Sequence, residues 1–137
     1  TDHAPHTFEE KQNKYSKAPS GGPLVQHSLV AMLQLFENKK ISLEKIIEKM
    51  CHNPAILFNI NKRGYIRKNF YADLIIAKPN HSWEVKKENI YYKCGWSPFV
   101  NETFANKILK TFVNGNLIYD DGIFNENTKG KRLTFNR

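Results

Sequence analysis

The residues that could do chemistry are concentrated at the start of this chain, where one carboxylate and two imidazoles fall within six positions. The segment reads Thr-Asp-His-Ala-Pro-His and contains Asp2, His3 and His6. Aspartate and histidine are both zinc ligands, and an aspartate can also act as a general base toward metal-bound water. A catalytic zinc usually takes three protein ligands, however. The segment by itself therefore predicts either part of a metal site or an exposed polar stretch.

The other reactive or aromatic residues favour structural roles. His27 falls in a helical pattern, and we expect it to contact the helix face or a loop rather than a metal. Cys51 and His52 are adjacent at a predicted helix end, where helix capping is favoured over a nucleophilic pair. Trp83 and Trp96 are expected to pack in the core rather than to form a stacking platform.

The elements that must position these residues begin with helices. Residues 7–22 are polar and contain Pro-Ser-Gly-Gly, so they predict a loop. Apolar residues then recur at three- and four-residue spacing from Pro23 to near Asn38, which predicts an amphipathic helix. Ser42 is placed to cap a second helix, and Asn53-Pro54 is predicted to start a short third one.

The second half of the chain has the patterns of short strands. Residues 72–77 form an apolar run that ends before Pro79, which is typical of a buried strand. Residues 107–119 predict a β-hairpin that turns at Asn114-Gly115, because this dipeptide tolerates the positive φ angles of a type I′ turn. Asp121-Gly122 predicts another turn.

Length and composition describe an ordinary globular domain. The 137 residues are 40% hydrophobic and 25% charged, which excludes a disordered chain or a fibre. No apolar run approaches the roughly 20 residues that span a bilayer, so we expect no membrane association. The net charge of +8 is carried by dispersed lysines and arginines. We therefore expect no nucleic-acid binding, although the charge would weakly suit an anionic substrate.

The two cysteines, Cys51 and Cys94, are too far apart for a CxxC metal site. They predict buried, reduced thiols in a cytoplasmic protein. The chain opens with Thr1 rather than Met, and neither its helical half nor its strand half closes by itself. We expect it to be the end of a larger protein.

The order of short motifs resembles that of the dihydroorotases, which belong to the cyclic amidohydrolase superfamily. The resemblance covers nearly the whole chain, and its most specific parts are Asp-His-Ala-Pro-His at residues 2–6 and Lys-Cys-Gly-Trp-Ser-Pro-Phe at residues 93–99. Ala-Asp-Leu at residues 72–74 and Val-Asn-Gly at residues 113–115 recur throughout the superfamily. Further matches occur at residues 9–11, 41–44, 53–55 and 64–66.

The resemblance implies an α/β fold that is part of a larger enzyme. Residues 1–60 would form the end of an amidohydrolase (β/α)8 barrel, namely the last strand tip, the substrate loop and the helices. Residues 61–137 would form short strands of a small β-sandwich subdomain and a tail. Asp2 would then lie at the C-terminal tip of the last barrel strand, where such barrels carry their chemistry.

The resemblance also implies a reaction, the zinc-dependent, reversible hydrolysis of dihydroorotate to N-carbamoyl-aspartate in pyrimidine biosynthesis. Asp2 matches the aspartate that ligates the metal and takes the proton of the bridging hydroxide. His6 matches the histidine that binds the substrate carboxylate, and Ser20 and Gly21 match a substrate-binding loop, although Ala-Pro-Ser-Gly-Gly-Pro departs from the usual pattern there. His3 has no role that the resemblance assigns.

The remaining metal ligands of the family, which are a His-x-His pair, a bridging modified lysine and two further histidines, have no counterpart in this chain. We therefore expect this chain alone to be inactive, and the full-length enzyme to hold one or two zinc ions, to act on a small molecule and to be a homo-oligomer. Three alternatives stay open. They are a related cyclic amidohydrolase such as a hydantoinase or allantoinase, a non-catalytic homologue that acts as a structural partner, and a basic nucleic-acid-binding module whose binding would vanish with salt.

Overall fold

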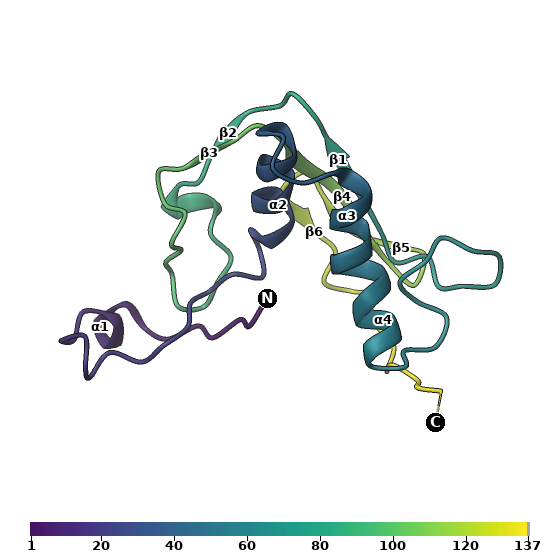
Figure 1. Cartoon of the computed structure of the whole chain (residues 1–137), viewed down its shortest axis with the longest axis horizontal. Helices are drawn as coiled ribbons and strands as arrows, with labels where there is room; N and C mark the ends of the chain where they lie inside the picture. Colours follow the sequence, from purple (N-terminus) through teal and green to yellow (C-terminus); the bar gives the residue numbers. More distant parts are fainter. Residues whose placement is uncertain (137) are drawn as a thin grey trace.

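A computed structural model describes residues 1–136, and its α-helices come before its strands, as the sequence predicts (Figure 1). The helical elements are α1 (Phe8–Lys11), α2 (Ser28–Glu37), α3 (Leu43–Ile47), the π-helical turn η1 (Glu48–His52), α4 (Asn53–Leu57) and the 3-10 turn η2 (Lys87–Asn89). The strands are β1 (Leu74–Lys78), β2 (Trp83–Glu84), β3 (Thr103–Phe104), β4 (Lys107–Val113), β5 (Asn116–Asp120) and β6 (Ile123–Phe124).

The one-turn helix α1 interrupts the stretch that the sequence predicts as a loop, so the prediction is wrong for residues 8–11. The Thr7 hydroxyl accepts from the Glu10 amide at 3.2 Å, and the Glu10 carboxylate accepts from the Thr7 amide at 2.8 Å. This reciprocal capping box satisfies two amides that a helix start leaves without partners. Lys11 Nζ donates to the carbonyls of Pro19 and Gly21, at 2.6 and 2.9 Å, and thereby folds the following loop back onto the helix.

The helix α2 begins at Ser28, later than the predicted start at Pro23. Residues 24–27 instead form a turn in which the His27 amide donates to the Leu24 carbonyl at 3.2 Å. The Leu24 amide donates to Nδ1 of His3 at 3.1 Å, and this contact keeps residues 24–27 out of the helix. The end of α2 at Glu37 agrees with the prediction.

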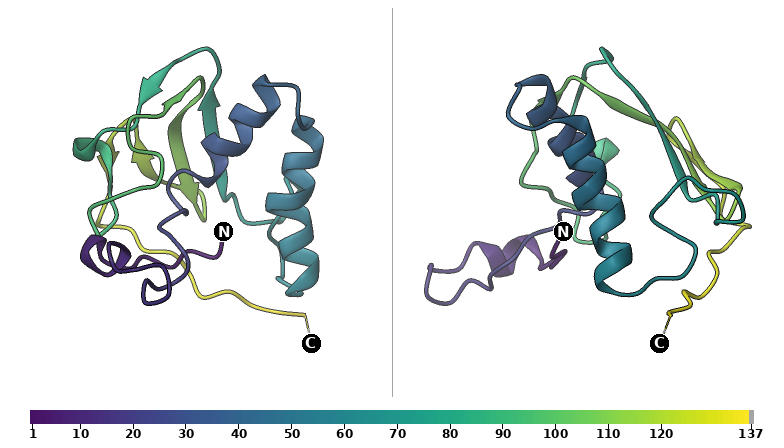
Figure 2. Two further views of the ribbon diagram at one scale, coloured as in Figure 1. Left: turned by 60° about the vertical axis from the view of Figure 1, so that its left-hand side comes forward. Right: turned by 45° about the vertical axis from the view of Figure 1, so that its right-hand side comes forward.

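The predicted second and third helices form one continuous helical run, so the prediction that a separate helix starts at Asn53-Pro54 is wrong. Ser42 caps the run as predicted, and its hydroxyl accepts from the Lys45 amide at 3.2 Å. The turn η1 precedes Pro54, which lacks an amide hydrogen and whose ring crowds the preceding turn of a helix. A wider π turn accommodates such a residue without ending the helix. Figure 2 shows this rod beside α2, antiparallel to it.

The strands β1, β4, β5 and β6 form an antiparallel sheet in the order β1-β4-β5-β6. The predicted hairpin is confirmed, because β4 and β5 are joined by Asn114 and Gly115, with φ angles of 53° and 84°. The second predicted turn is also confirmed, since Asp121 and Gly122 join β5 to β6 with φ angles of 43° and 102°.

The strand β1 lies at the edge of this sheet, paired with β4 from Leu74↔Phe112 to Lys78↔Lys107. All five of its residues are exposed, with Ile75 at 51%. The prediction of a buried strand is therefore wrong within residues 1–136. An apolar run without alternation is the pattern of a strand that is covered on both faces, and none of the described elements supplies that cover.

The hydrophobic core lies between α2 and the two-stranded ribbon of β2 and β3. Val30 from α2 packs against Val85 and Phe104, and all three are buried. Partly buried apolar residues surround them, namely Ala31, Trp83, Ile90, Phe99 and Ile108. The core thus joins residues from both regions that the sequence divides at residue 60, and that division stays a prediction.

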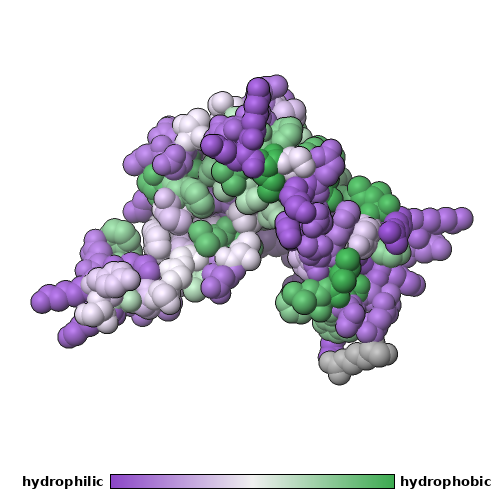
Figure 3. All heavy atoms as spheres, in the orientation of Figure 1, coloured by the Kyte–Doolittle hydropathy of each residue, from purple (hydrophilic) through white to green (hydrophobic). Residues whose placement is uncertain are grey.

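The outer side of the helical rod leaves apolar side chains on the surface (Figure 3). Ile56, Leu57 and Phe58 at the end of α4 are 61%, 74% and 61% exposed. Of the helices in the described part of the chain, none has both the length and the apolarity needed to cross a membrane.

Candidate functional site

The structure brings the first six residues of the chain alongside the Ser-Gly-Gly loop. His3 forms a parallel β-bridge with Gly22, and the Ala4 amide donates to the Gly22 carbonyl at 3.1 Å. The two stretches of backbone therefore run side by side at this point. They carry all four site residues that the sequence predicts, namely Asp2, His6, Ser20 and Gly21.

Gly21 permits this close approach. Its φ is +88°, which side chains other than glycine rarely adopt, and a Cβ at this position would lie 2.5 Å from the Cβ of Ala4. The close approach that the structure shows at Gly21 is therefore toward the first segment of the chain, at Ala4. The role of Ser20 and Gly21 toward a substrate stays a prediction.

Asp2 is exposed at the edge of this arrangement. Its φ of 47° lies in the left-handed region, which aspartate tolerates better than most residues. None of the ion pairs among residues 1–136 involves its carboxylate. The carboxylate is thus accessible to a metal or to a proton donor, and its assignment as ligand and proton acceptor stays a prediction.

His6 is half-buried and lies between two partners. Its Nδ1 is 3.8 Å from the carboxylate of Glu10, which lies in the first turn of α1. Its backbone carbonyl accepts a hydrogen bond from the indole nitrogen of Trp96 at 2.8 Å. The backbone of His6 is therefore tied to a residue far along the chain, and its ring is close to α1.

His3 has a structural role that the sequence does not indicate. Its Nδ1 accepts from the amides of Leu24 and Val25, at 3.1 and 3.4 Å, and its ring lies 5.3 Å from that of Tyr92. These contacts hold residues 1–6 against the turn that precedes α2. Nothing local in the sequence could have shown this, because the partners are 21 and more residues away.

Residues 1–136 do not by themselves build a zinc site. No group of three His, Cys, Asp or Glu side chains in this range is placed to hold a metal ion. Nδ1 of His3 is engaged by backbone amides, and Nδ1 of His6 faces Glu10. Asp2 is then one ligand of a suitable type, which is fewer than the three that a catalytic zinc usually takes.

Trp96 lies beside this site, although the sequence predicts that it packs in the core. Beyond its bond to the His6 carbonyl, its ring lies 3.9 Å from where a Cβ would stand on Gly22. It also faces the ring of Phe8 in α1, at a centroid distance of 6.4 Å. The Lys-Cys-Gly-Trp-Ser-Pro-Phe motif is the sequence signal that could have placed Trp96 here.

His27 is fully buried at the start of α2 and contacts a loop, as predicted. Its Nδ1 lies 3.1 Å from the Ser97 hydroxyl and 3.5 Å from the Tyr92 hydroxyl. Its ring packs beside those of Trp83 and Phe104, at centroid distances of 6.1 and 6.3 Å. Burial lowers the pKa of His27 below its ordinary value, because a charged imidazole would lose its hydration there.

The prediction of buried thiols is wrong, because Cys51 is exposed and Cys94 is half-buried; both are free. The sequence predicts that His52 caps a helix, and this is wrong, because its side chain makes no capping hydrogen bond. Its ring instead stacks on that of Tyr65, at a centroid distance of 4.2 Å and an angle of 8°. Exposure and ring stacking depend on tertiary packing, which leaves no local pattern in the sequence.

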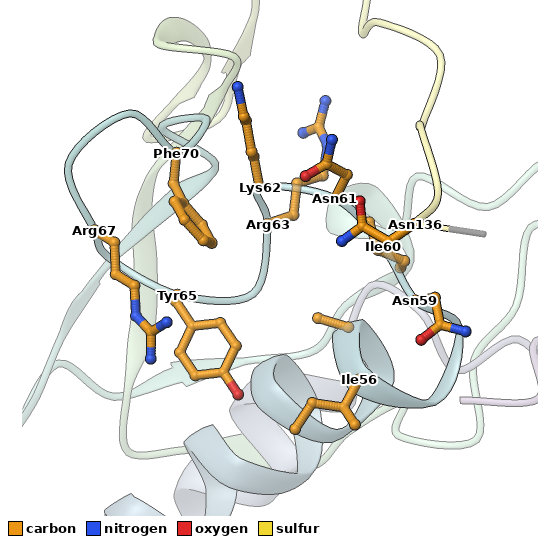
Figure 4. Close-up of a pocket in the computed structure, with 11 residues that line it drawn as sticks. Ile56, Asn59, Ile60, Asn61, Lys62, Arg63, Tyr65, Arg67, Phe70 and Asn136 are labelled. Carbon is orange, nitrogen blue, oxygen red and sulfur yellow. The ribbon is translucent and has the colours of Figure 1, made fainter.

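A cavity of about 310 Å³ lies between α4 and residues 59–70 (Figure 4). Two arginines line it, and both already have partners in the protein. Arg63 pairs with Asp73, and the Arg67 guanidinium lies over the Tyr65 ring at 4.3 Å. None of the predicted site residues lines this cavity. It is therefore separate from the arrangement around Asp2 and His6.

Comparisons with known proteins agree on one family. Residues 1–118 match the model of the Amidohydrolase family. The dihydroorotase of Methanosphaera stadtmanae is 35% identical over 121 residues, and that of Clostridioides difficile is 38% identical over 121 residues; each match covers 88% of this chain and 28% of the relative. The solved structure of an L-hydantoinase (dihydropyrimidinase) from Arthrobacter aurescens is similar with a TM-score of 0.83 and 29% identity, over 90% of this chain and 29% of that one. The chain thus spans less than a third of the length of the relatives that it matches.

Proposed function

The chain belongs to the amidohydrolase family, and from this premise we propose that it is the C-terminal portion of a dihydroorotase. The observation that carries the proposal is the pairing of the Asp-His-Ala-Pro-His segment with the Ser-Gly-Gly loop through His3 and Gly22. This pairing places the residues that resemble the family's site on adjacent backbone. The identity of 35% and 38% to two dihydroorotases supports the same substrate class.

The proposed architecture is the end of a (β/α)8 barrel over residues 1–60 and part of a small β-sandwich over residues 61–137. The exposed face of α4 and the uncovered strand β1 support it, because both carry apolar side chains that further elements of a longer protein would cover. The family resemblance further leads us to propose that the full-length protein is a cytoplasmic homo-oligomer that acts on a small molecule.

The proposed reaction is the reversible hydrolysis of dihydroorotate to N-carbamoyl-aspartate. The oxygen of water bonds to the amide carbon, the ring C–N bond breaks, and the leaving nitrogen takes up a proton. Asp2 would accept the proton of the attacking water and pass it to that nitrogen. His6 would bind the substrate carboxylate through a charge-assisted hydrogen bond, beside the backbone of Ser20 and Gly21.

The proposal includes one or two zinc ions, whose remaining ligands would come from residues outside this chain. Asp2 would be the ligand that this chain contributes. Its exposed carboxylate, which makes no ion pair with residues 1–136, supports that assignment.

A related cyclic amidohydrolase of the hydantoinase type is the second candidate. The observation that favours it is the TM-score of 0.83 to the L-hydantoinase from Arthrobacter aurescens. The chemistry proposed for Asp2 would be unchanged, because a cyclic amide is opened in both cases. The carboxylate contact proposed for His6 would separate the two candidates, since hydantoin carries no such group.

The test uses the full-length protein that contains this sequence, assayed with dihydroorotate and with hydantoin. We expect turnover of dihydroorotate, and we expect Asp2→Asn to lose nearly all of it while remaining folded, because the amide is a poor metal ligand and accepts no proton. Glu9→Gln is the matched control, since it makes the same chemical change at an exposed position nearby. It should keep wild-type turnover.

Each outcome separates the candidates. Turnover of Asp2→Asn at the wild-type rate would exclude the role of Asp2. Turnover of hydantoin but not of dihydroorotate would favour the second candidate. A folded wild-type protein without either activity would favour a non-catalytic homologue.

A further inference from the structure

We propose that Trp96 is a positioning residue, which holds the His6 segment and the glycine loop in the arrangement that the site needs. This inference rests on the proposed function, in which His6 binds the substrate carboxylate. Trp96 itself would not touch the substrate.

The indole of Trp96 lies beside all three pieces of chain around the site. Its nitrogen donates to the His6 carbonyl at 2.8 Å, and its ring lies 6.4 Å from the Phe8 ring of α1, centroid to centroid. A Cβ on Gly22 of the loop would stand 3.9 Å from the same ring. Among residues 1–22, the regular structure is one β-bridge and the one-turn helix α1, and side chains such as His3 and Lys11 supply further contacts. Trp96 differs from these two because it comes from a distant part of the chain and reaches all three pieces.

The His6 backbone depends on this contact. Residues before it are paired with Gly22, and Thr7 after it begins the capping box of α1. Between them, the His6 amide makes only a local hydrogen bond, to the Ala4 carbonyl at 3.0 Å. The bond from Trp96 is thus the long-range anchor of the residue whose ring is proposed to meet the substrate.

The loop that presents Trp96 is firmly held at its other end. The neighbouring residue Ser97 is buried, and its hydroxyl bonds both the His27 ring at 3.1 Å and the Phe99 amide at 3.2 Å. The hydroxyl of Tyr92 accepts from the Gln26 amide at 2.8 Å. Because His27 is packed in the core, the position of the Trp96 indole is set by the core as well.

Trp83 supplies a matched control for a merely structural role. Its indole nitrogen donates to the Asn106 carbonyl at 2.9 Å, which is the same kind of hydrogen bond. Its ring packs against the core cluster rather than against the candidate site. Replacing either tryptophan by phenylalanine therefore removes the same donor and keeps an aromatic ring, but only Trp96 contacts the candidate site directly.

The kinetic test compares Trp96→Phe with Trp83→Phe in the full-length protein. We expect Trp96→Phe to raise KM for dihydroorotate about 3- to 10-fold, as the loss of one neutral hydrogen bond would, with a smaller change in kcat. Inhibition by dihydrouracil, which lacks the carboxylate, should be unchanged in this variant. Trp83→Phe should lower the thermal midpoint and leave KM unaltered. In a His6→Ala background, Trp96→Phe should add little, because both changes then act on the same contact.

Hydrogen exchange of the backbone gives a second readout that needs no activity. Amides of residues 1–7 should exchange faster in Trp96→Phe than in the wild type, and should be unaffected in Trp83→Phe. Unchanged exchange in this segment, or equal effects of the two variants on KM, would overturn the inference. A wild-type protein that does not turn over dihydroorotate would instead contradict the proposed function, while the exchange experiment would still decide whether Trp96 orders the segment.

Discussion

His6 stands at the point where the candidate site is open to solvent and also fixed to the protein. The Glu10 carboxylate lies 3.8 Å from its Nδ1, which leaves Nε2 as the nitrogen directed away from that contact. The His6 backbone is anchored by the Trp96 indole at 2.8 Å, and such preorganisation of a residue lowers the cost of binding. This geometry agrees with the role proposed for His6 toward a substrate carboxylate.

Replacing His6 by alanine in the full-length protein should weaken the handling of the substrate without loss of zinc. The missing charge-assisted hydrogen bond is worth about 1.5–3 kcal/mol, so kcat/KM for dihydroorotate should fall about 10- to 150-fold. Steady-state kinetics and metal analysis measure the two quantities. His81→Ala, which removes a histidine outside the site, should change neither. If zinc were lost together with activity, His6 would be a metal ligand instead.

The buried His27 should make stability depend on pH. Its pKa is lowered in the folded protein from the ordinary value of 6.5. Above that value the ring is neutral in both states, and His27 contributes no pH dependence. Below it the unfolded chain takes up a proton that the folded protein resists, so the free energy of unfolding falls as the pH falls.

We therefore expect the thermal midpoint of the wild-type protein to decrease between about pH 7.5 and about pH 5.5. His27→Gln should decrease less over this range, because glutamine does not titrate but can still accept from the Ser97 hydroxyl. The comparison concerns the slope with pH, since the variant is expected to be less stable at every pH. Equal slopes would show that other groups cause the dependence.

At the level of elements, the junction between the first segment and the glycine loop is short and depends on its neighbours. One β-bridge joins His3 to Gly22, and Lys11 from α1 donates to two carbonyls of the same loop. The close fit of Gly21 against Ala4 lets these contacts form together. A change in the volume of either residue should therefore disturb the β-bridge and the Lys11 hydrogen bonds together.

Gly21→Ala should displace the loop and reduce kcat/KM of the full-length protein, because the added methyl group would stand 2.5 Å from the Ala4 Cβ. Crowding of this kind costs about 1–3 kcal/mol, and the positive φ adds strain. The double variant with Ala4→Gly should recover part of the loss, since the crowding is then removed and the strain remains. Gly95→Ala is the control, because Gly95 also has a positive φ (68°) but no atom within 4 Å of the added Cβ. Activity of Gly21→Ala equal to that of Gly95→Ala would contradict the close packing.

At the level of the whole molecule, the core cluster of Val30, Val85 and Phe104 is small and lies between α2 and the β2–β3 ribbon. Many large apolar residues elsewhere are exposed, and they include Leu57 at 74%, Ile66 at 89% and Ile123 at 74%. Such surface is normally covered by a partner or by other parts of the same protein. This distribution supports the proposal that the chain works as part of a longer enzyme.

The 137-residue chain by itself should therefore be inactive, bind no zinc tightly and associate with itself. Its described residues offer no group of three metal ligands. Its exposed apolar side chains would drive association of chains in water through the hydrophobic effect. Zinc analysis after dialysis, an assay with dihydroorotate and sedimentation of the purified chain measure these properties. Stoichiometric tight zinc together with turnover would show that the ligand count, and the fragment proposal with it, is wrong.

The sequence by itself determined those features whose causes lie within a few residues. Ser42 caps its helix because its hydroxyl reaches an amide three positions away, and Asn114-Gly115 turns the hairpin because both residues accept positive φ. The capping box of Thr7 and Glu10 belongs to the same class and was readable in principle. The candidate site is different, because the segment at residues 1–6 by itself predicts either part of a metal site or an exposed polar stretch, and the roles of its residues come from the family resemblance.

Only the tertiary structure decided which distant residues serve that motif and which surfaces are covered. Trp96 meets the His6 carbonyl across 90 positions, and Ser97 meets His27 across 70. The late start of α2, the exposure of β1 and the continuous helix through Pro54 likewise differ from the local patterns. The physical reason is that hydrogen bonds and burial depend on what lies alongside a residue in space, whereas local patterns express only the preferences of neighbours along the chain.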